Sequence, residues 1–179
     1  MVGRWETDAV LCSQQHAGSV ATTGSVTPMD VNEDFVDIAR AFLDARVDFV
    51  IVGAYALAAH GFPRMTGDID LFVRPSPDNA LRVFRALAEF GAPIAAHGVT
   101  QHDFEVEGKV YQLGLPPRRI DILTSISGVS FDEAVQDAIE GNLGPVRVRF
   151  IGKAAMAKNK LASGRPKDLI DAELLQDAD

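Results

Sequence analysis

Two aspartates two positions apart open an apolar segment of the chain, Asp-Ile-Asp-Leu-Phe-Val at residues 68–73. On a β-strand, Asp68 and Asp70 would point to the same face, about 6 to 7 Å apart, while Ile69 and Leu71 would face the core. Like charges placed in this way repel each other unless a cation lies between them. Carboxylate oxygens are hard ligands that suit Mg²⁺ or Mn²⁺. The pair is therefore predicted to bind a metal ion for catalysis; the alternatives are a turn cap or a structural ion site.

A third aspartate, Asp121, stands inside the apolar run Arg-Ile-Asp-Ile-Leu. An unpaired charge is expensive to bury in such a strand, and its most economical explanation is a face shared with Asp68 and Asp70. Three carboxylates on adjacent strands form a two-metal site, in which ions about 3.5 to 4 Å apart activate an attacking hydroxyl and stabilise the leaving oxygen. We therefore predict all three aspartates to be catalytic and metal-binding, provided that the two strands are neighbours.

Gly53 and Ala54 follow the apolar run Asp-Phe-Val-Ile-Val, where a strand is expected to turn into a short helix of small residues. Glycine permits a close approach of the backbone there, and the exposed amides at a helix start attract an anion such as a triphosphate. Both residues are therefore predicted to bind a nucleotide.

Basic and polar side chains elsewhere are further candidates for nucleotide binding. Arg64 and Thr66 lie just before the aspartate pair, where the arginine could meet a triphosphate, although an ordinary surface loop explains them as well. Seven Lys or Arg residues and no Asp or Glu occur from Arg147 to Lys167. This stretch is either a solvated helix face or a local anion site. Within it, the candidates for clamping phosphates or an acidic acceptor are Lys160, Arg165 and Lys167.

Hydrophobic periodicity and turn residues predict an alternation of helices and strands around these candidates. Helices are expected over residues 31–45, 54–60, 78–90, 131–140, 153–162 and 166–177, with Asp30 or Asn32 as the cap of the first. Strands are expected over residues 48–53, 68–73, 102–106, 109–114, 119–123 and 146–151. Residues 1–28, rich in Ser, Thr, Gly and Gln, are expected to be a poorly ordered extension, and residues 29–179 a single domain.

The composition narrows the class of protein. With 179 residues, 47% of them hydrophobic, the chain can bury a core, and its single cysteine, Cys12, excludes an internal disulfide. The net charge of −8 argues against a protein that coats nucleic acid non-specifically. No apolar run is long enough to span a membrane, and acidic residues interrupt the first eleven positions, so a soluble cytoplasmic protein is expected.

Residues 49–73 read Phe-Val-Ile-Val-Gly-Ala-Tyr-Ala-Leu-Ala-Ala-His-Gly-Phe-Pro-Arg-Met-Thr-Gly-Asp-Ile-Asp-Leu-Phe-Val. This segment resembles the core signature of the DNA polymerase β-like nucleotidyltransferase superfamily: an apolar strand, Gly-Gly or Gly-Ser, a short helix, then Asp-x-Asp in an apolar strand. Within it, the chain is most similar to the small bacterial AbiEii-type toxins and minimal nucleotidyltransferases of toxin-antitoxin and phage-defence loci. Residues 160–171, Lys-Leu-Ala-Ser-Gly-Arg-Pro-Lys-Asp-Leu-Ile-Asp, resemble the closing helices of that group.

The resemblance implies an α/β (α+β) fold with a mixed central sheet flanked by helices and closed by C-terminal helices. It implies transfer of a nucleoside monophosphate from an NTP to a hydroxyl of RNA, such as tRNA, or of a protein, with Mg²⁺ or Mn²⁺ as cofactor. A cognate toxin or antitoxin would be a further partner. Asp68 and Asp70 would hold both metals, Asp121 would bind the catalytic metal and help deprotonate the acceptor, and Gly53 and the Ala54 amide would meet the phosphates.

One residue departs from this signature, because Ala54 stands where a serine or second glycine is common. Triphosphate binding would then rely on the backbone and on basic side chains. The departure keeps open an alternative, an antitoxin-like or catalytically silent module that binds a partner. Haloacid dehalogenase-like phosphatases and glycosyltransferases are disfavoured, because in them an apolar strand precedes the Asp-x-Asp pair. A P-loop kinase is excluded, because Gly-x-x-x-x-Gly-Lys-Ser/Thr does not occur.

Overall fold

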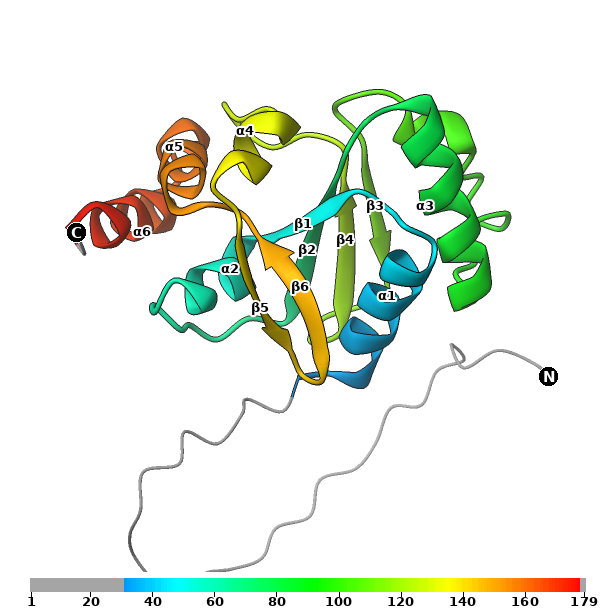
Figure 1. Ribbon diagram of the computed structural model, residues 1–179, viewed down its shortest axis with the longest axis horizontal. Helices are drawn as coiled ribbons and strands as arrows, with labels where there is room; N and C mark the ends of the chain where they lie inside the picture. The colour runs from blue at the N-terminus through cyan, green and yellow to red at the C-terminus, as the bar shows by residue number, and fades with distance from the viewer. Residues whose placement is uncertain (1–30, 178–179) are drawn as a thin grey trace, which may run out of the picture.

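The computed structural model describes residues 31–177, in which six strands form one mixed sheet with helices packed against it (Figure 1). The strands lie in the order β3-β4-β2-β1-β6-β5. Their bounds are β1 (Phe49–Val52), β2 (Asp68–Val73), β3 (Val110–Leu113), β4 (Arg119–Leu123), β5 (Ile139–Leu143) and β6 (Val146–Phe150). The pairs β2–β4 and β1–β6 are parallel, and β1–β2, β3–β4 and β5–β6 are antiparallel. The expected α/β fold with a mixed central sheet is confirmed.

Six α-helices and one 3₁₀-helix complete the part of the chain that the structure describes. They are α1 (Glu33–Asp44), α2 (Gly53–Ala59), α3 (Pro77–Phe90), the 3₁₀-helix η1 (Gln101–Phe104), α4 (Phe131–Gln136), α5 (Lys153–Ser163) and α6 (Pro166–Asp177). The expected C-terminal helix pair is present, because α5 ends at Gly164 in a left-handed conformation and α6 begins two residues later at a proline.

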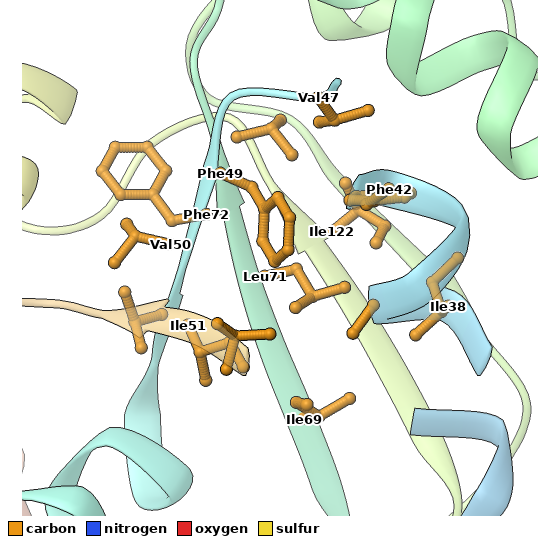
Figure 2. Packing of buried hydrophobic residues seen from close by; sticks show 14 of the residues in the cluster. Ile38, Phe42, Val47, Phe49, Val50, Ile51, Ile69, Leu71, Phe72 and Ile122 are labelled. Atoms are coloured by element: carbon orange, nitrogen blue, oxygen red, sulfur yellow. The ribbon is translucent and has the colours of Figure 1, made fainter. Parts of the chain in front are cut away.

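Different helices pack on the two faces of the sheet. Helix α1, whose start is capped by the Asn32 side chain as predicted, contributes Ile38 and Phe42 to the core beside Leu71 and Ile122 of the sheet (Figure 2). Alternation along a strand sends neighbouring side chains to the opposite face, where Phe72 packs edge-on against Phe131 of α4. The aspartates of β2 and β4 belong to this second face, away from α1.

Two predicted elements are wrong. Residues 102–106 are not a strand, because a capping box between Thr100 and Asp103 closes a 3₁₀-turn there. The helix expected over residues 131–140 ends at Gln136, and strand β5, which was not predicted, follows it and pairs with β6. Gly141 of β5 suits this pairing, because a Cβ there would lie only 2.9 Å from the Phe150 ring.

The predicted extension over residues 1–28, with Cys12, lies outside the described residues. Within residues 31–177, no helix is long and apolar enough to cross a membrane.

Candidate functional site

Strands β2 and β4 run side by side in parallel, and their register brings the three aspartates to one face. Asp70 is paired with Asp121, and Asp68 is paired with Arg119. The intervening residues, Ile69 among them, are buried on the opposite face with the core. The condition on which Asp121 was nominated, that its strand neighbours that of Asp68 and Asp70, is therefore met.

An arginine that the sequence analysis did not nominate lies among these carboxylates. The Arg119 guanidinium donates to Asp68 Oδ2 over 2.6 Å and to the two Asp121 oxygens, Oδ1 and Oδ2, over 2.8 and 2.9 Å. Asp121 is only 5% exposed, and Arg119 is the charge that compensates its burial. A positive residue two positions before Asp121 on one strand was a signal that could have identified it, because both side chains must share a face.

Asp70 stands apart from this ion pair. Within residues 31–177, no hydrogen bond to its carboxylate is formed, and Oδ2 lies against the backbone of Gly53. Burial, followed by repulsion from Asp68 and Asp121, raises the pKa of Asp70 to about 6, although the charges of Arg119 and Lys160 oppose the rise. A carboxylate so placed gains from any cation that approaches it.

Gly53 is the residue that makes room for Asp70. It begins α2 with a φ of +67°, and a Cβ built on it would lie 2.1 Å from Asp70 Oδ2. A left-handed conformation and this close approach both require glycine. The half-buried Ala54 follows in the first turn of the helix, so the strand-to-helix turn expected here is present.

Neutral side chains donate further hydrogen bonds to the other two carboxylates, Asp68 and Asp121. Thr66 donates its hydroxyl to Asp68 Oδ1 over 2.5 Å, and Gln112 of β3 donates its amide to Asp121 Oδ1 over 3.2 Å. Thr66, which was predicted to bind a nucleotide, therefore lies beside the aspartates; its role in nucleotide binding stays a prediction.

Two of the predicted phosphate-binding cations, Arg64 and Lys160, converge on Asp171 of α6. Arg64 donates to the Asp171 carboxylate over 2.5 and 2.6 Å, and Lys160 lies 3.1 Å from its Oδ2. Lys160 is only 8% exposed, and its positive charge acts to lower the pKa of Asp70. Lys167, in contrast, is exposed at the start of α6 and forms no ion pair within residues 31–177.

Asp168, the other buried carboxylate of α6, also binds Lys160. It accepts hydrogen bonds from Lys160 over 2.6 Å, from the Ser163 hydroxyl over 2.6 Å and from Arg165 over 2.5 Å. Burial alone would raise the pKa of Asp168, but these three donors outweigh it and lower the pKa to about 2. Asp168 therefore forms ion pairs with two cations, Lys160 and Arg165.

Two ring-bearing side chains of the α2 segment, His60 and Tyr55, contact other parts of the chain. His60 is tied to the main chain, with Nε2 at 2.7 Å from the carbonyl oxygen of Ile151. Tyr55 of α2 packs edge-on against Phe35 with ring centroids 5.8 Å apart. Burial, and secondarily the charge of Asp68, raises the pKa of Tyr55.

The aspartates suit a divalent cation by their chemistry, but their present arrangement is that of an ion pair. In the described part of the chain, no three His, Cys, Asp or Glu side chains form a ready metal-ligand cluster. Arg119 engages two of the three carboxylates, whereas Asp70 faces the Gly53 cradle without a counter-charge of its own. By their chemistry, the hard oxygens of the three carboxylates fit Mg²⁺ or Mn²⁺.

Comparison with known proteins shows the fold. No protein-family model and no curated protein matches the sequence. Among solved structures, the chain is similar to the antibiotic-resistance factor ANT(2'')-Ia, an aminoglycoside nucleotidyltransferase known from its solution structure. The TM-score is 0.50, the two sequences are 16% identical, and the match covers 82% of each chain. The fold is therefore nucleotidyltransferase-like.

Proposed function

We propose that the protein is a metal-dependent nucleotidyltransferase, which transfers a nucleoside monophosphate from an NTP to an acceptor hydroxyl and releases pyrophosphate. The observation that carries the proposal is the placement of Asp68, Asp70 and Asp121 on one face of the paired strands β2 and β4. The backbone of Gly53 lies against Asp70 on this face. The nucleotidyltransferase-like fold supports the proposal, and so does the resemblance of Asp68-Ile69-Asp70 to the Asp-x-Asp signature.

In the proposed mechanism, the three aspartates share the binding of metal, and Asp121 has an additional role. Asp68, Asp70 and Asp121 would hold Mg²⁺ or Mn²⁺, which supplies charge to activate the acceptor hydroxyl and to stabilise the leaving oxygen. Asp121 would accept the proton of the acceptor hydroxyl. The acceptor oxygen then forms a bond to the α-phosphorus, while the bond from that phosphorus to the bridging oxygen breaks and pyrophosphate departs.

The triphosphate would meet positive charge from Arg64 and Lys160. Their shared partner, Asp171, holds both side chains on the same side of the molecule, which limits the rotamer entropy lost when phosphates bind. The backbone at Gly53 and Ala54 would meet the phosphates directly, since Ala54 brings no hydroxyl. Lys167 stays a candidate at the exposed start of α6.

Labelled transfer tests the proposal. The protein is incubated with Mg²⁺ and NTPs carrying ³²P at either the α or the γ position, together with total tRNA, cell protein or an aminoglycoside. We expect α-label but no γ-label in one of these acceptors, and no transfer by Asp70→Asn. Glu89→Gln, which neutralises an exposed carboxylate on α3, is the matched control. γ-label in the acceptor, or equal transfer by Asp70→Asn, would overturn the proposal.

For the acceptor, we propose a hydroxyl of RNA, such as tRNA, or of a protein, in a toxin-antitoxin or phage-defence setting. Growth arrest on expression, relieved by Asp68→Ala, is the expected result for a toxin enzyme. Arrest that persists in Asp68→Ala, or none with the parent, would contradict a toxin role.

A second candidate function is a catalytically silent module that binds a cognate toxin or antitoxin. The observation that favours it is the Arg119 guanidinium, which already forms ion pairs with Asp68 and Asp121, together with Ala54. Such a module would bind neither Mn²⁺ nor NTP at the aspartates, and Asp70→Asn would leave its partner binding unchanged.

A further inference from the structure

Asp68, Asp70 and Asp121 share one face of the sheet, which we call the aspartate face. This face already contains one cation, the guanidinium of Arg119. It bridges the two strands, because Asp68 belongs to β2 whereas Asp121 and Arg119 itself belong to β4. Three charge-assisted hydrogen bonds of 2.6 to 2.9 Å hold it there. The oxygens that it engages are ones that a metal ion at this face would require.

The fit between guanidinium and carboxylates is incomplete. Asp70 lies next to Asp121 in the register, yet no hydrogen bond from Arg119 reaches it, and none from another side chain does within residues 31–177. The guanidinium therefore places a single positive charge beside three carboxylates and bonds to two of them. A divalent cation would supply twice that charge from a position that Asp70 shares.

The Arg119 side chain can move away from the aspartates towards solvent. It is 28% exposed, so its guanidinium borders solvent while Asp121 beneath it is nearly buried. A long side chain on a fixed strand can move its head group outward by rotamer changes alone, which leaves the pairing of β2 and β4 intact.

We propose that Arg119 is an exchangeable internal counterion: it pairs with Asp68 and Asp121 in the metal-free protein, and binding of Mg²⁺ or Mn²⁺ displaces it towards solvent. The inference rests on the proposed function, since it takes the aspartates to be the metal ligands. Its consequence is regulatory, because metal binding must first break the three hydrogen bonds of Arg119. The metal-free protein is stabilised at the expense of metal affinity.

Mn²⁺ binding to the full-length, nucleotide-free protein tests the exchange, measured by the loss of the free Mn²⁺ EPR signal. Arg119→Gln is compared with the parent and with Arg118→Gln, which removes the same charge from an exposed neighbour that forms no ion pair within residues 31–177. Hydrogen bonds to charged groups are each strong enough to change an equilibrium about tenfold or more, so we expect about tenfold tighter binding for Arg119→Gln. Arg118→Gln should stay within about twofold of the parent.

A second measurement uses the unsubstituted protein, in case Arg119→Gln does not fold. The Arg119 Nε–H, which donates to Asp121 Oδ1, should give a slowly exchanging ¹⁵N–¹H NMR signal without metal. Adding Mg²⁺ should shift this signal and make its proton exchange at least tenfold faster.

The outcomes separate the two proposals. Equal Mn²⁺ affinity in the parent and in Arg119→Gln, or an Arg119 signal unchanged at saturating Mg²⁺, would overturn the exchange and leave the proposed function standing. Failure of every variant to bind Mn²⁺ at millimolar concentration would overturn both.

Discussion

Neutralising Asp70 should stabilise the metal-free protein, although most substitutions of half-buried residues destabilise. Raising the pKa of this carboxyl from 3.8 to about 6 costs the folded, ionised protein about 3 kcal/mol relative to the unfolded chain. Asp70→Asn keeps the shape of the side chain and removes the charge. We expect a gain of about 1 to 3 kcal/mol in the free energy of unfolding at pH 8, because the amide recovers part of that cost.

The pH dependence gives the sign of the effect. Because the folded pKa of Asp70 lies above the unfolded value, its protonated form favours the fold below pH 3.8. This contribution is lost as the pH rises from 3.8 through about 6, and it stays lost above that. The difference in stability between Asp70→Asn and the parent should therefore grow between about pH 4 and 6 and then level off.

Urea unfolding in EDTA, followed by circular dichroism at pH 4, 5, 6 and 8, measures this difference. Glu89→Gln, the exposed control on α3, should change stability by less than about 0.5 kcal/mol at every pH. Mg²⁺ with NTP should reverse the order, since the parent gains binding energy that the variant lacks. If Asp70→Asn is no more stable than the parent at pH 8 without metal, the electrostatic reasoning is refuted.

Two further substitutions test the elements that hold the site. Gly53→Ala should lower the free energy of unfolding by about 1 to 3 kcal/mol in urea titrations and weaken Mn²⁺ binding, because its Cβ overlaps Asp70 and its φ is positive; an unchanged stability would contradict the close approach. Asp168→Asn should cost about 3 kcal/mol at pH 7, because Lys160 loses a buried partner, whereas the exposed Glu173→Gln on the same helix should cost almost nothing. Since the pKa of Asp168 is lowered to about 2, the parent's advantage should disappear as the pH falls from about 4 to 2; an advantage that persists at pH 2 would argue against this ion network.

The central strands and the aspartate face could be predicted because each left a local signal. An apolar strand with Asp at every second position fixes which side chains share a face, and the cost of burying Asp121 pointed to a neighbouring strand. The structure has that strand, β4, beside β2. The catalytic and metal-binding roles of these residues stay predictions.

The ion pair of Arg119 with Asp68 could not be predicted, because it depends on the register between strands far apart in sequence. The pattern Arg-Ile-Asp places Arg119 and Asp121 on one face, but only the pairing of β2 with β4 puts Asp68 within reach of the guanidinium. Strand β5 was missed for a related reason: Ile-Glu-Gly-Asn-Leu has low strand propensity, and it is held by its partner β6.

The capacity of the aspartate face to support nucleotidyl transfer is tested most directly by one measurement: Mg²⁺-dependent incorporation of label from α-³²P-NTP into an acceptor from tRNA, cell protein or aminoglycoside, by the parent and by Asp70→Asn side by side. We predict incorporation by the parent that EDTA abolishes, and at least a hundredfold less with Asp70→Asn. Incorporation that survives EDTA, or that proceeds equally in Asp70→Asn, would contradict the assignment of chemistry to Asp68, Asp70 and Asp121.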